Sequence, residues 1–195
     1  VFFGGVARLA SVTEKIVPFM AAIYIIGGSY VIACHAGELG NAFRLIFVAA
    51  FDPQAVMGGA LGLTVAKAMQ FGVARGLFSN EAGMGSTPHA HAVAKVEHPA
   101  EQGLVAIFGV FATLIVVTFT GIVILVTGVL DFQSTGIALT QKAYNVGLGS
   151  FGVSFVAICL FFFAYSTIIG WYFFAEQNVR FLFSEKALLP YRVIV

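Results

Sequence analysis

Long apolar runs alternate with short polar segments along this chain, and four of the runs are long enough to cross a membrane. A helix needs about 20 apolar residues to cross roughly 30 Å of hydrocarbon. Residues 16–34, 103–130 and 151–175 contain no charged side chain. We therefore predict an all-α polytopic membrane protein with a single transmembrane domain over residues 1–195. The four predicted spans cover about residues 16–35, 56–86, 103–130 and 151–175.

Polar residues predict where the first span begins. Residues 11–15 are Ser-Val-Thr-Glu-Lys, so Ser11 or Thr13 is a candidate N-cap. Pro18 would then lie in the first turn, where its missing N–H leaves no helical bond unmade. This pattern predicts that the helix starts close to Ile16.

Two connecting segments predict shorter elements. Residues 38–47 are too short and too polar to span, and their amphipathic pattern predicts an interfacial helix that ends at Asp52-Pro53. Residues 131–149 are rich in Gly, Ser, Thr and Asn, which predicts either a loop or a short re-entrant helix.

Composition supports a membrane protein and excludes several other classes. Hydrophobic residues make up 59% of the chain and charged residues only 10%, against roughly 25% charged in soluble domains. These values exclude a soluble globular domain and a disordered segment. The formal net charge of +1 excludes a basic nucleic-acid binder. Both cysteines, Cys34 and Cys159, lie in apolar runs, so no disulfide framework is expected.

The placement of positive charge predicts the orientation. Alternate connections lie on opposite sides of the membrane, so residues 1–15, 87–102 and 176–192 share one side, and residues 37–55 and 131–145 share the other. The first side carries six Lys or Arg residues and the second only two. By the positive-inside rule, the first side is cytoplasmic. Its six basic residues are Arg8, Lys15, Lys95, Arg180, Lys186 and Arg192.

The second predicted span is unlike a lipid-facing helix. A charge at bilayer depth costs about 2.5–3.5 kcal/mol or more, and each Gly costs about 1 kcal/mol of helix propensity relative to Ala. Ser79, Asn80 and Glu81 nevertheless follow one another here among several glycines. We therefore predict that this helix unwinds within the membrane, where irregular backbone is tolerated only if it is buried or lines a cavity. Broken helices of this kind bind substrates and ions in secondary transporters.

Two structural explanations compete with that prediction. The glycines alone could allow close helix packing, although this leaves Asn80 and Glu81 unexplained. Glu81 could instead pair with Arg75 as a buried ion pair. Their spacing of six residues puts them on different faces of a continuous helix, so this pairing would also require a break.

The segment from Arg75 to Ser86, RGLFSNEAGMGS, resembles the signature of the alanine/glycine:cation symporters, also called sodium:alanine symporters. Three further stretches match this family in register. They are RLASVTEKIVPFM at 8–20, HPAEQGLV at 98–105 and STIIGWYFFAE at 166–176. The resemblance covers essentially the whole chain.

The resemblance implies a prokaryotic inner-membrane carrier that couples uptake of a small neutral amino acid, alanine or glycine, to sodium entry. It also implies the inverted-repeat fold of the leucine transporter, in which the first helix of each repeat is broken. Residues 56–86 would be the broken helix of the second repeat. The other broken helix and the closing helices would lie outside residues 1–195, so an internal piece of a longer protein is expected. No cofactor is implied beyond sodium as the coupling ion.

Within the broken helix we expect the substrate to meet exposed backbone and the Asn80 amide. Met84 would form an apolar wall of this site or only pack against neighbours. Glu81 would either neutralise a cation or hold the unwound geometry by hydrogen bonds, and we favour the second role. The expected substrate-binding residues are Phe78, Ser79, Asn80, Gly83, Met84, Gly85 and Trp171.

By analogy with that fold, the paired hydroxyls of Ser166 and Thr167 would ligate sodium, a hard cation that suits oxygen ligands. The alternative is that both hydroxyls bond back to the preceding helical carbonyls, as they often do in membrane helices. Trp171 lies one turn after Thr167 and would cap the substrate pocket, unless it is an interfacial anchor.

Two other functions are compatible with parts of the sequence. His89, His91 and His98 could hold zinc in a membrane metalloenzyme, although a solvated loop or short helix is the favoured interpretation of this segment. Ser166 and Thr167 could line the pore of an ion-channel fragment. The sequence contains no His-Glu-x-x-His, Gly-x-Ser-x-Gly or phosphate-loop motif, so no catalytic residue is predicted.

Overall fold

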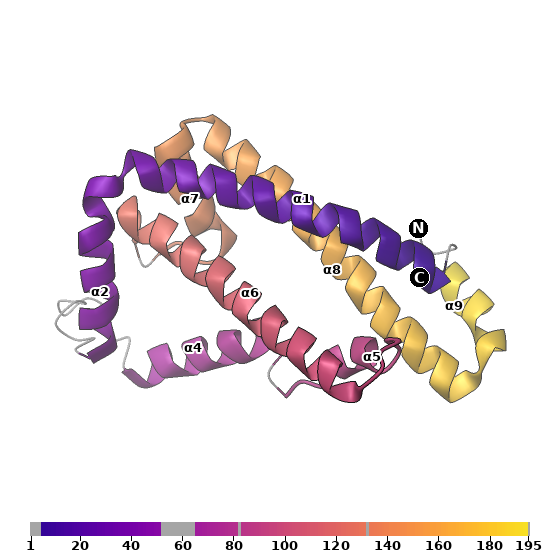
Figure 1. The fold of residues 1–195 in the computed structure, drawn as a ribbon. Helices are drawn as coiled ribbons and strands as arrows, with labels where there is room; N and C mark the ends of the chain where they lie inside the picture. Colours follow the sequence, from indigo (N-terminus) through magenta and orange to yellow (C-terminus); the bar gives the residue numbers. More distant parts are fainter. Residues whose placement is uncertain (1–4, 52–64, 82, 132, 195) are drawn as a thin grey trace.

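The computed structural model describes residues 5–51, 65–81, 83–131 and 133–194 (Figure 1). Three helices dominate this part of the chain: α1 (Gly5–Cys34), α6 (Pro99–Val126) and α8 (Phe151–Phe183). All three are long and apolar enough to cross a membrane. The shorter helices are α2 (Leu39–Phe51), α4 (Val65–Ser79), α5 (Thr87–His91), α7 (Ile137–Leu148) and α9 (Leu188–Ile194). Single 3-10 turns at Ala36–Glu38 and Glu185–Ala187 precede α2 and α9.

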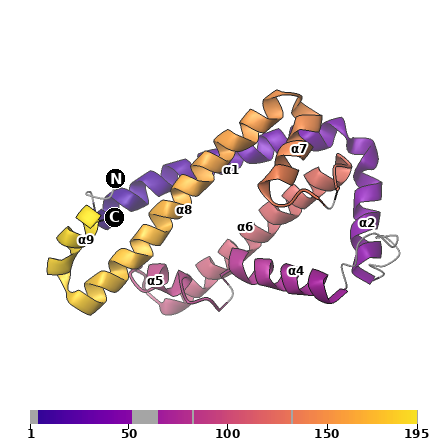
Figure 2. The ribbon, with the colours of Figure 1, turned by 180° about the vertical axis from the view of Figure 1, so that it is seen from behind.

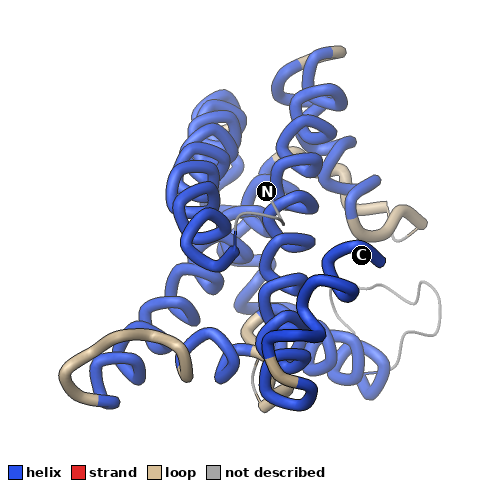
Figure 3. Tube along the Cα trace, turned by 90° about the vertical axis from the view of Figure 1, so that its right-hand side faces the viewer, coloured by secondary structure: helices blue, strands red, loops and turns tan. Residues whose placement is uncertain are grey.

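The described residues contain helices and loops and no strand, in agreement with the predicted all-α class (Figure 3). α1 and α8 lie side by side, with α7 packed against both of them, and α6 also packs on α1 (Figures 1 and 2). Each of the three long helices corresponds to a predicted span. Of the remaining predicted span, 56–86, residues 56–64 and 82 lie outside the described residues. Its described part consists of the 15-residue helix α4 and the residues that follow it up to Ser86.

A buried aromatic cluster joins α1, α6, α7 and α8. Tyr24 of α1 and Tyr144 of α7 have ring centroids 5.7 Å apart, and the Tyr24 hydroxyl bonds the Thr120 hydroxyl of α6 at 2.7 Å. Val31 of α1 and Val156 of α8 are almost fully buried in the same cluster. Tyr24 and Thr120 can therefore lie within this bundle because their two hydroxyls bond each other.

Glycines bring the backbones of these helices close together. A Cβ added at Gly28 would lie 2.3 Å from Phe119, and one at Gly147 would lie 2.6 Å from Val31. At Gly152 the added Cβ would lie 2.2 Å from the backbone carbonyl oxygen of Tyr144, an atom that has no freedom to move away. Small residues at such contacts are the usual means by which membrane helices approach each other.

The first helix begins earlier than its polar start predicts. α1 is already helical at Gly5, so the prediction of an N-cap at Ser11 or Thr13 is wrong. The Thr13 hydroxyl instead bonds back to the Leu9 carbonyl at 2.9 Å, and Pro18 lies inside the helix. Leu9 is buried in a cluster with Ile169 of α8. This tertiary packing extends the helix past its local capping signal.

The last span is also longer than predicted. α8 continues through Glu176 to Phe183, whereas the apolar pattern stops at Ala175. The Glu176 side chain is fully buried and accepts a bond of 2.6 Å from Arg192 of α9, which folds back along α8. Glu176 can lie within the helix because Arg192 of α9 pairs with it.

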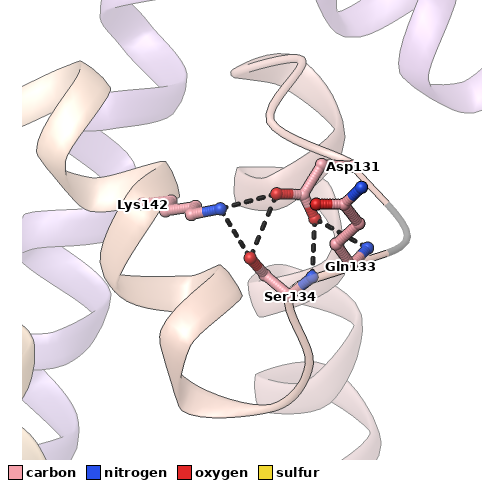
Figure 4. Close-up of polar contacts among 4 residues, drawn as sticks. All are labelled: Asp131, Gln133, Ser134 and Lys142. Atoms are coloured by element: carbon pink, nitrogen blue, oxygen red, sulfur yellow. Dashed lines mark hydrogen bonds and ion pairs between the residues drawn. The ribbon is translucent and has the colours of Figure 1, made fainter.

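Helices form in both connecting segments. The segment predicted as an interfacial helix is helical as α2, and its place at the membrane surface stays a prediction. Of the two alternatives for 131–149, a loop or a short re-entrant helix, the structure has a short helix, α7, and its re-entrant character stays a prediction. Asp131 fixes the turn before α7: its carboxylate accepts bonds from Lys142, from the Ser134 hydroxyl and from the backbone N–H groups of Gln133 and Ser134 (Figure 4). The Lys142 ammonium and the Ser134 N–H hold the pKa of Asp131 well below its ordinary value.

Gly152 offers a test of the α7–α8 contact. We expect Gly152→Ala to lower the melting temperature of the protein in detergent, because overpacking a rigid contact costs roughly 1–3 kcal/mol. Gly109→Ala on α6 is the control, since a Cβ there meets nothing within 4 Å. Equal melting temperatures for the two variants would contradict the close packing of α7 on α8.

Candidate functional site

The helix that was predicted to unwind does so at the expected residues. α4 ends at Ser79, and helix resumes only with α5 at Thr87. In between, Glu81, Gly83 and Gly85 have φ angles of 53°, 87° and 86°. This left-handed region is open to glycine and costly for other residues. Three residues of one short segment therefore have left-handed backbone, which no continuous α-helix allows.

Glu81 holds this segment in place. One carboxylate oxygen accepts bonds from both the backbone N–H and the hydroxyl of Thr87, each at 3.1 Å. A carboxylate at a helix N-terminus satisfies free N–H groups and the helix dipole, and such charged bonds offset the strain at a left-handed residue. Among the described residues Glu81 makes no ion pair with Arg75, so the geometry fits the structural role that the sequence favours for Glu81.

Asn80 lies at the end of α4 with one half of its amide in use. Its Nδ2 donates to the Gly76 carbonyl at 3.3 Å, while its Oδ1 is buried and has no partner among the described residues. The Ser86 hydroxyl, at the far end of the segment, is also buried and has no partner among the described residues. Buried polar atoms are nearly always paired. Two buried atoms that have no partner among the described residues, from Asn80 and Ser86, flank the break between α4 and α5.

The other predicted substrate residues of this segment are open in the described chain. Phe78 is 64% exposed and Met84 is 47% exposed. Ser79, Gly83 and Gly85 are exposed as well. Ser79 also donates to the Gly76 carbonyl, at 3.3 Å.

Both hydroxyls of the predicted sodium pair point to one atom. Ser166 and Thr167 donate to the carbonyl oxygen of Phe163 at 2.9 and 2.8 Å. This is the back-bonded geometry that the sequence left open as an alternative. It does not exhaust the two oxygens, because a hydroxyl that donates its hydrogen keeps two lone pairs.

The structure does not gather all the predicted residues into one pocket. The residues after the break meet α8 at Asn178, which accepts a bond from His89 of α5. Asn178 lies eleven positions beyond Thr167, or about 16 Å along the helix axis. Trp171, 44% exposed, packs edge-on against Phe174 with centroids 5.7 Å apart. Ser166 and Thr167 therefore lie deeper along α8 than its contact with α5.

A cavity of about 280 Å³ lies where α1, α5 and α8 meet, and none of the predicted site residues lines it. Its lining is apolar apart from the Thr13 hydroxyl, which is engaged with Leu9. The residues that line it are Leu9, Ala10, Thr13, Ala90, Ile169, Gly170, Phe173 and Phe174.

The three histidines each have their own partner. His89 bonds Asn178, the Nδ1 of His91 lies 2.7 Å from the Gln102 amide oxygen, and His98 caps α6 by accepting from the Ala100 N–H at 3.2 Å. Over the described residues, no three His, Cys, Asp or Glu side chains come together as a metal site would need. The short helix at 87–91 is the favoured interpretation, and the zinc alternative has no geometric support.

Sequence reasoning missed the ionic cluster at the end of α8. Glu176, Arg180 and Arg192 form it, and the rings of Tyr172 and Tyr191 stack beside it at 5.6 Å. The hydrogen bond to Glu176 raises the pKa of Arg192. A glutamate directly after an apolar run was the available signal, but its partner lies 16 residues away and depends on the turn before α9.

Glu81 can be tested by separating charge from shape. We expect Glu81→Gln to keep both bonds from Thr87 and to remain close to the wild type in stability. Glu81→Ala loses both bonds and should lower the free energy of unfolding by about 1–3 kcal/mol. Thermal unfolding and backbone hydrogen exchange over 80–92 measure this. If both variants lose equal stability, the carboxylate charge, rather than the two bonds, carries the role.

Sequence comparisons place the chain among known transporters. An uncharacterized transporter of Haemophilus influenzae is 43% identical over 196 residues, which are 99% of this chain and 43% of that protein. The sodium/alanine symporter AgcS of Methanococcus maripaludis is 40% identical over 198 residues, 99% of this chain and 43% of that protein. The probable sodium/glutamine symporter GlnT of Bacillus subtilis is 40% identical over 196 residues, 99% of this chain and 40% of that protein.

The chain spans about two fifths of the length of these curated relatives. A sequence model of the sodium:alanine symporter family matches residues 1–195. This match covers the broken helix and all three long helices, and it agrees with the resemblance seen in the motif at 75–86. The chain belongs to the sodium:alanine symporter family.

Proposed function

We propose that this chain is part of a carrier that moves a small neutral amino acid, alanine or glycine, into the cell together with sodium by alternating access. The observation that carries the proposal is the break between α4 and α5, with the unpaired amide oxygen of Asn80 at its edge. The family to which the chain belongs, and the names of its relatives, support sodium-coupled transport in place of an enzymatic activity.

In this proposal the break supplies polar groups at a depth where a lipid-facing helix has none. The last carbonyls of α4 and the Asn80 oxygen are acceptors, so they suit the ammonium group of an amino acid. The N–H groups at the start of α5 are already in use, because that of Thr87 donates to Glu81 and that of His89 donates to the Ser86 carbonyl. The substrate carboxylate is therefore received by other donors, and the exposed Phe78 and Met84 lie near an apolar side chain. In the complete carrier, Trp171 of α8 would cap this pocket.

Sodium would bind at Ser166 and Thr167. Their hydroxyl hydrogens are directed at Phe163, so their lone pairs are available to a cation. These two oxygens supply only part of a sodium coordination shell. The rest comes from helices that the inverted-repeat fold places opposite α8, in the part of the carrier beyond this chain.

The fold in this proposal is that of the leucine transporter. α1 closes the first repeat, α4 and α5 form the broken first helix of the second, and α6 and α8 are the next two helices. The positive-inside rule puts α5 and α9 at the cytoplasmic face of a prokaryotic plasma membrane. α7, on the opposite side, packs over the ends of α1 and α8.

The amino acid that the carrier transports is the part of this proposal with the fewest supporting observations. The names of the relatives differ in the amino acid they give. AgcS is named a sodium/alanine symporter and GlnT a probable sodium/glutamine symporter, and two further relatives are named as sodium/proton-dependent alanine carriers. The shared chemistry is a neutral α-amino acid, which has one ammonium and one carboxylate group.

Asn80 gives the first test. We expect Asn80→Ala in the full-length carrier to abolish sodium-dependent uptake of labelled alanine in proteoliposomes, because the substrate loses its acceptor. Asn145→Ala on α7, whose side chain is exposed, is the matched control and should transport normally. Unchanged uptake by Asn80→Ala would show that Asn80 is not part of the substrate site. Wild-type uptake that does not depend on sodium would contradict the symport proposal itself.

The sodium pair gives a second test. We expect Ser166→Ala with Thr167→Val to raise the sodium concentration for half-maximal uptake at least about tenfold, which corresponds to about 1.4 kcal/mol. Thr113→Val on α6 is the control, because Thr113 also bonds back to a helical carbonyl at 3.0 Å and lies in no proposed site. If the double variant and the control behave alike, the two hydroxyls only bond back within α8.

A further inference from the structure

A cavity of about 220 Å³ lies between α1, α6, α7 and α8, beside the buried aromatic cluster. Its lining includes three residues that carry a hydroxyl, Tyr24, Thr120 and Thr140, and one that carries a thiol, Cys159. None of the described residues that line it is charged. Since a water molecule takes up about 30 Å³ in the liquid, the cavity has room for several. The rest of its wall is apolar and consists of Val116, Ile137, Val156, Leu160 and Phe163.

The hydrogen bonds of two of these hydroxyls have a fixed direction. The Thr120 hydroxyl bonds the Val116 carbonyl oxygen at 2.9 Å, and since a carbonyl only accepts, Thr120 is the donor. Its single hydrogen is thereby used, so in the 2.7 Å contact with Tyr24 the phenol donates and Thr120 accepts. The Tyr24 oxygen keeps its two lone pairs. The Thr140 hydroxyl has no hydrogen-bond partner among the described residues. The wall thus offers oxygen lone pairs, whereas the hydrogens of Tyr24 and Thr120 are already in use.

The cavity and the proposed sodium pair lie on one face of α8. Ser166 and Thr167 follow the lining residue Phe163 by three and four positions, a spacing that puts helical residues on the same face. Thr167 is therefore about 6 Å farther along the helix axis than Phe163. The Phe163 ring packs edge-on against Tyr24, with centroids 5.5 Å apart, and its carbonyl oxygen accepts from both hydroxyls of the pair. Phe163 is thus shared by the cavity and the pair.

Lone pairs on uncharged oxygens suit a cation that keeps its water. The waters around a cation turn their oxygens to the ion and their hydrogens outward, so they need acceptors in the wall. The waters around an anion turn hydrogens inward and need donors from the wall, which Tyr24 and Thr120 no longer offer. A cation without its water would instead lose its hydration in a cavity that supplies no opposite charge.

The positive-inside rule puts α7 and the start of α8 at the outer face, so the cavity lies on the outer side of Ser166 and Thr167. We propose that the cavity is an outer binding site for a hydrated sodium ion, which the ion occupies before it reaches Ser166 and Thr167. The passage from one site to the other rests on the function proposed above, whereas binding in the cavity does not.

The basic residue of α7 does not oppose a cation in this cavity. Lys142 is the one charged residue of α7 and follows Thr140 by two positions. Its ammonium bonds the Asp131 carboxylate and the Ser134 hydroxyl (Figure 4). The Asp131 carboxylate thereby offsets the positive charge that this helix carries.

Cys159 makes occupancy of the cavity measurable, because it lines the wall and is otherwise buried. The test uses the full-length carrier in right-side-out vesicles, with every cysteine except Cys159 replaced by serine. We expect the cationic reagent methanethiosulfonate ethylammonium to label Cys159, and its anionic sulfonate counterpart to react at least about tenfold more slowly. Sodium chloride should slow labelling by the cationic reagent about tenfold or more, whereas choline chloride should not. A thiol that neither reagent reaches, or labelling that sodium leaves unchanged, would overturn the proposal.

Hydroxyl variants locate the effect of sodium in the cavity. Tyr24→Phe with Thr140→Val should raise the sodium concentration for half-maximal protection at least about tenfold. Tyr30→Phe with Thr113→Val is the matched control, because Tyr30 is exposed on α1 and Thr113 bonds back within α6. Thr140→Val alone leaves the Tyr24 bond intact and should shift protection in the same direction, so it replaces the double variant if that one folds poorly. Wild-type protection in the cavity variants would contradict the site.

The sodium pair shows whether protection arises in the cavity or at a distance. In Ser166→Ala with Thr167→Val, sodium should still protect Cys159, because the outer site does not use these two hydroxyls. Loss of protection there would show that sodium acts from the pair through a change of shape, and the outer site would be wrong. Sodium-dependent uptake without protection of Cys159 in the otherwise unchanged carrier would overturn only the outer site. Protection of Cys159 without sodium-dependent uptake would overturn only the proposed transport.

Discussion

The packing of α1 along α8 is the constraint on which the rest of the described structure depends. α8 carries Ser166, Thr167, Trp171, Glu176 and Asn178, so its position places the proposed sodium pair, the ionic cluster with α9 and the contact with α5. Its place is fixed at one end by the buried tyrosine cluster and at the other by Leu9 and Ile169. Dispersion and shape complementarity hold the two helices together. The hydrophobic effect adds little between them, because lipid tails are as apolar as the helices themselves. Small residues at the contact therefore matter as much as large ones.

Against that rigid frame, the break between α4 and α5 is held by a few polar contacts. Glu81 adopts a backbone conformation that costs on the order of 1–3 kcal/mol for a residue other than glycine. Its bonds from Thr87 offset this cost, while Asn80 and Ser86 keep polar atoms unpaired. A segment that is strained and incompletely paired without ligand is suited to a binding step that completes its hydrogen bonds.

How much the sequence predicts depends on whether a feature is local. The three long spans follow from apolar length alone, and the break at 79–86 follows from glycine and charge at bilayer depth, so both are predictable and both are present. The predicted start of α1 is wrong, because the packing of Leu9 on α8 outweighs a local cap at Thr13. The bond between His89 and Asn178 joins residues 89 positions apart, so no local pattern contains it. Site residues known from a motif are thus placed on elements, but their distances come only from tertiary structure.

The two hydroxyls that share the carbonyl of Phe163 have a consequence for what can approach them. With both hydrogens turned into the helix, the open side of Ser166 and Thr167 presents only lone pairs. An anion that arrives there finds no donor, and a water molecule can settle only by pointing a hydrogen inward. A bare cation needs no such alignment, and no hydroxyl has to rotate to receive it. In the proposed sodium site, this arrangement would favour cations over anions before size or coordination number has any effect.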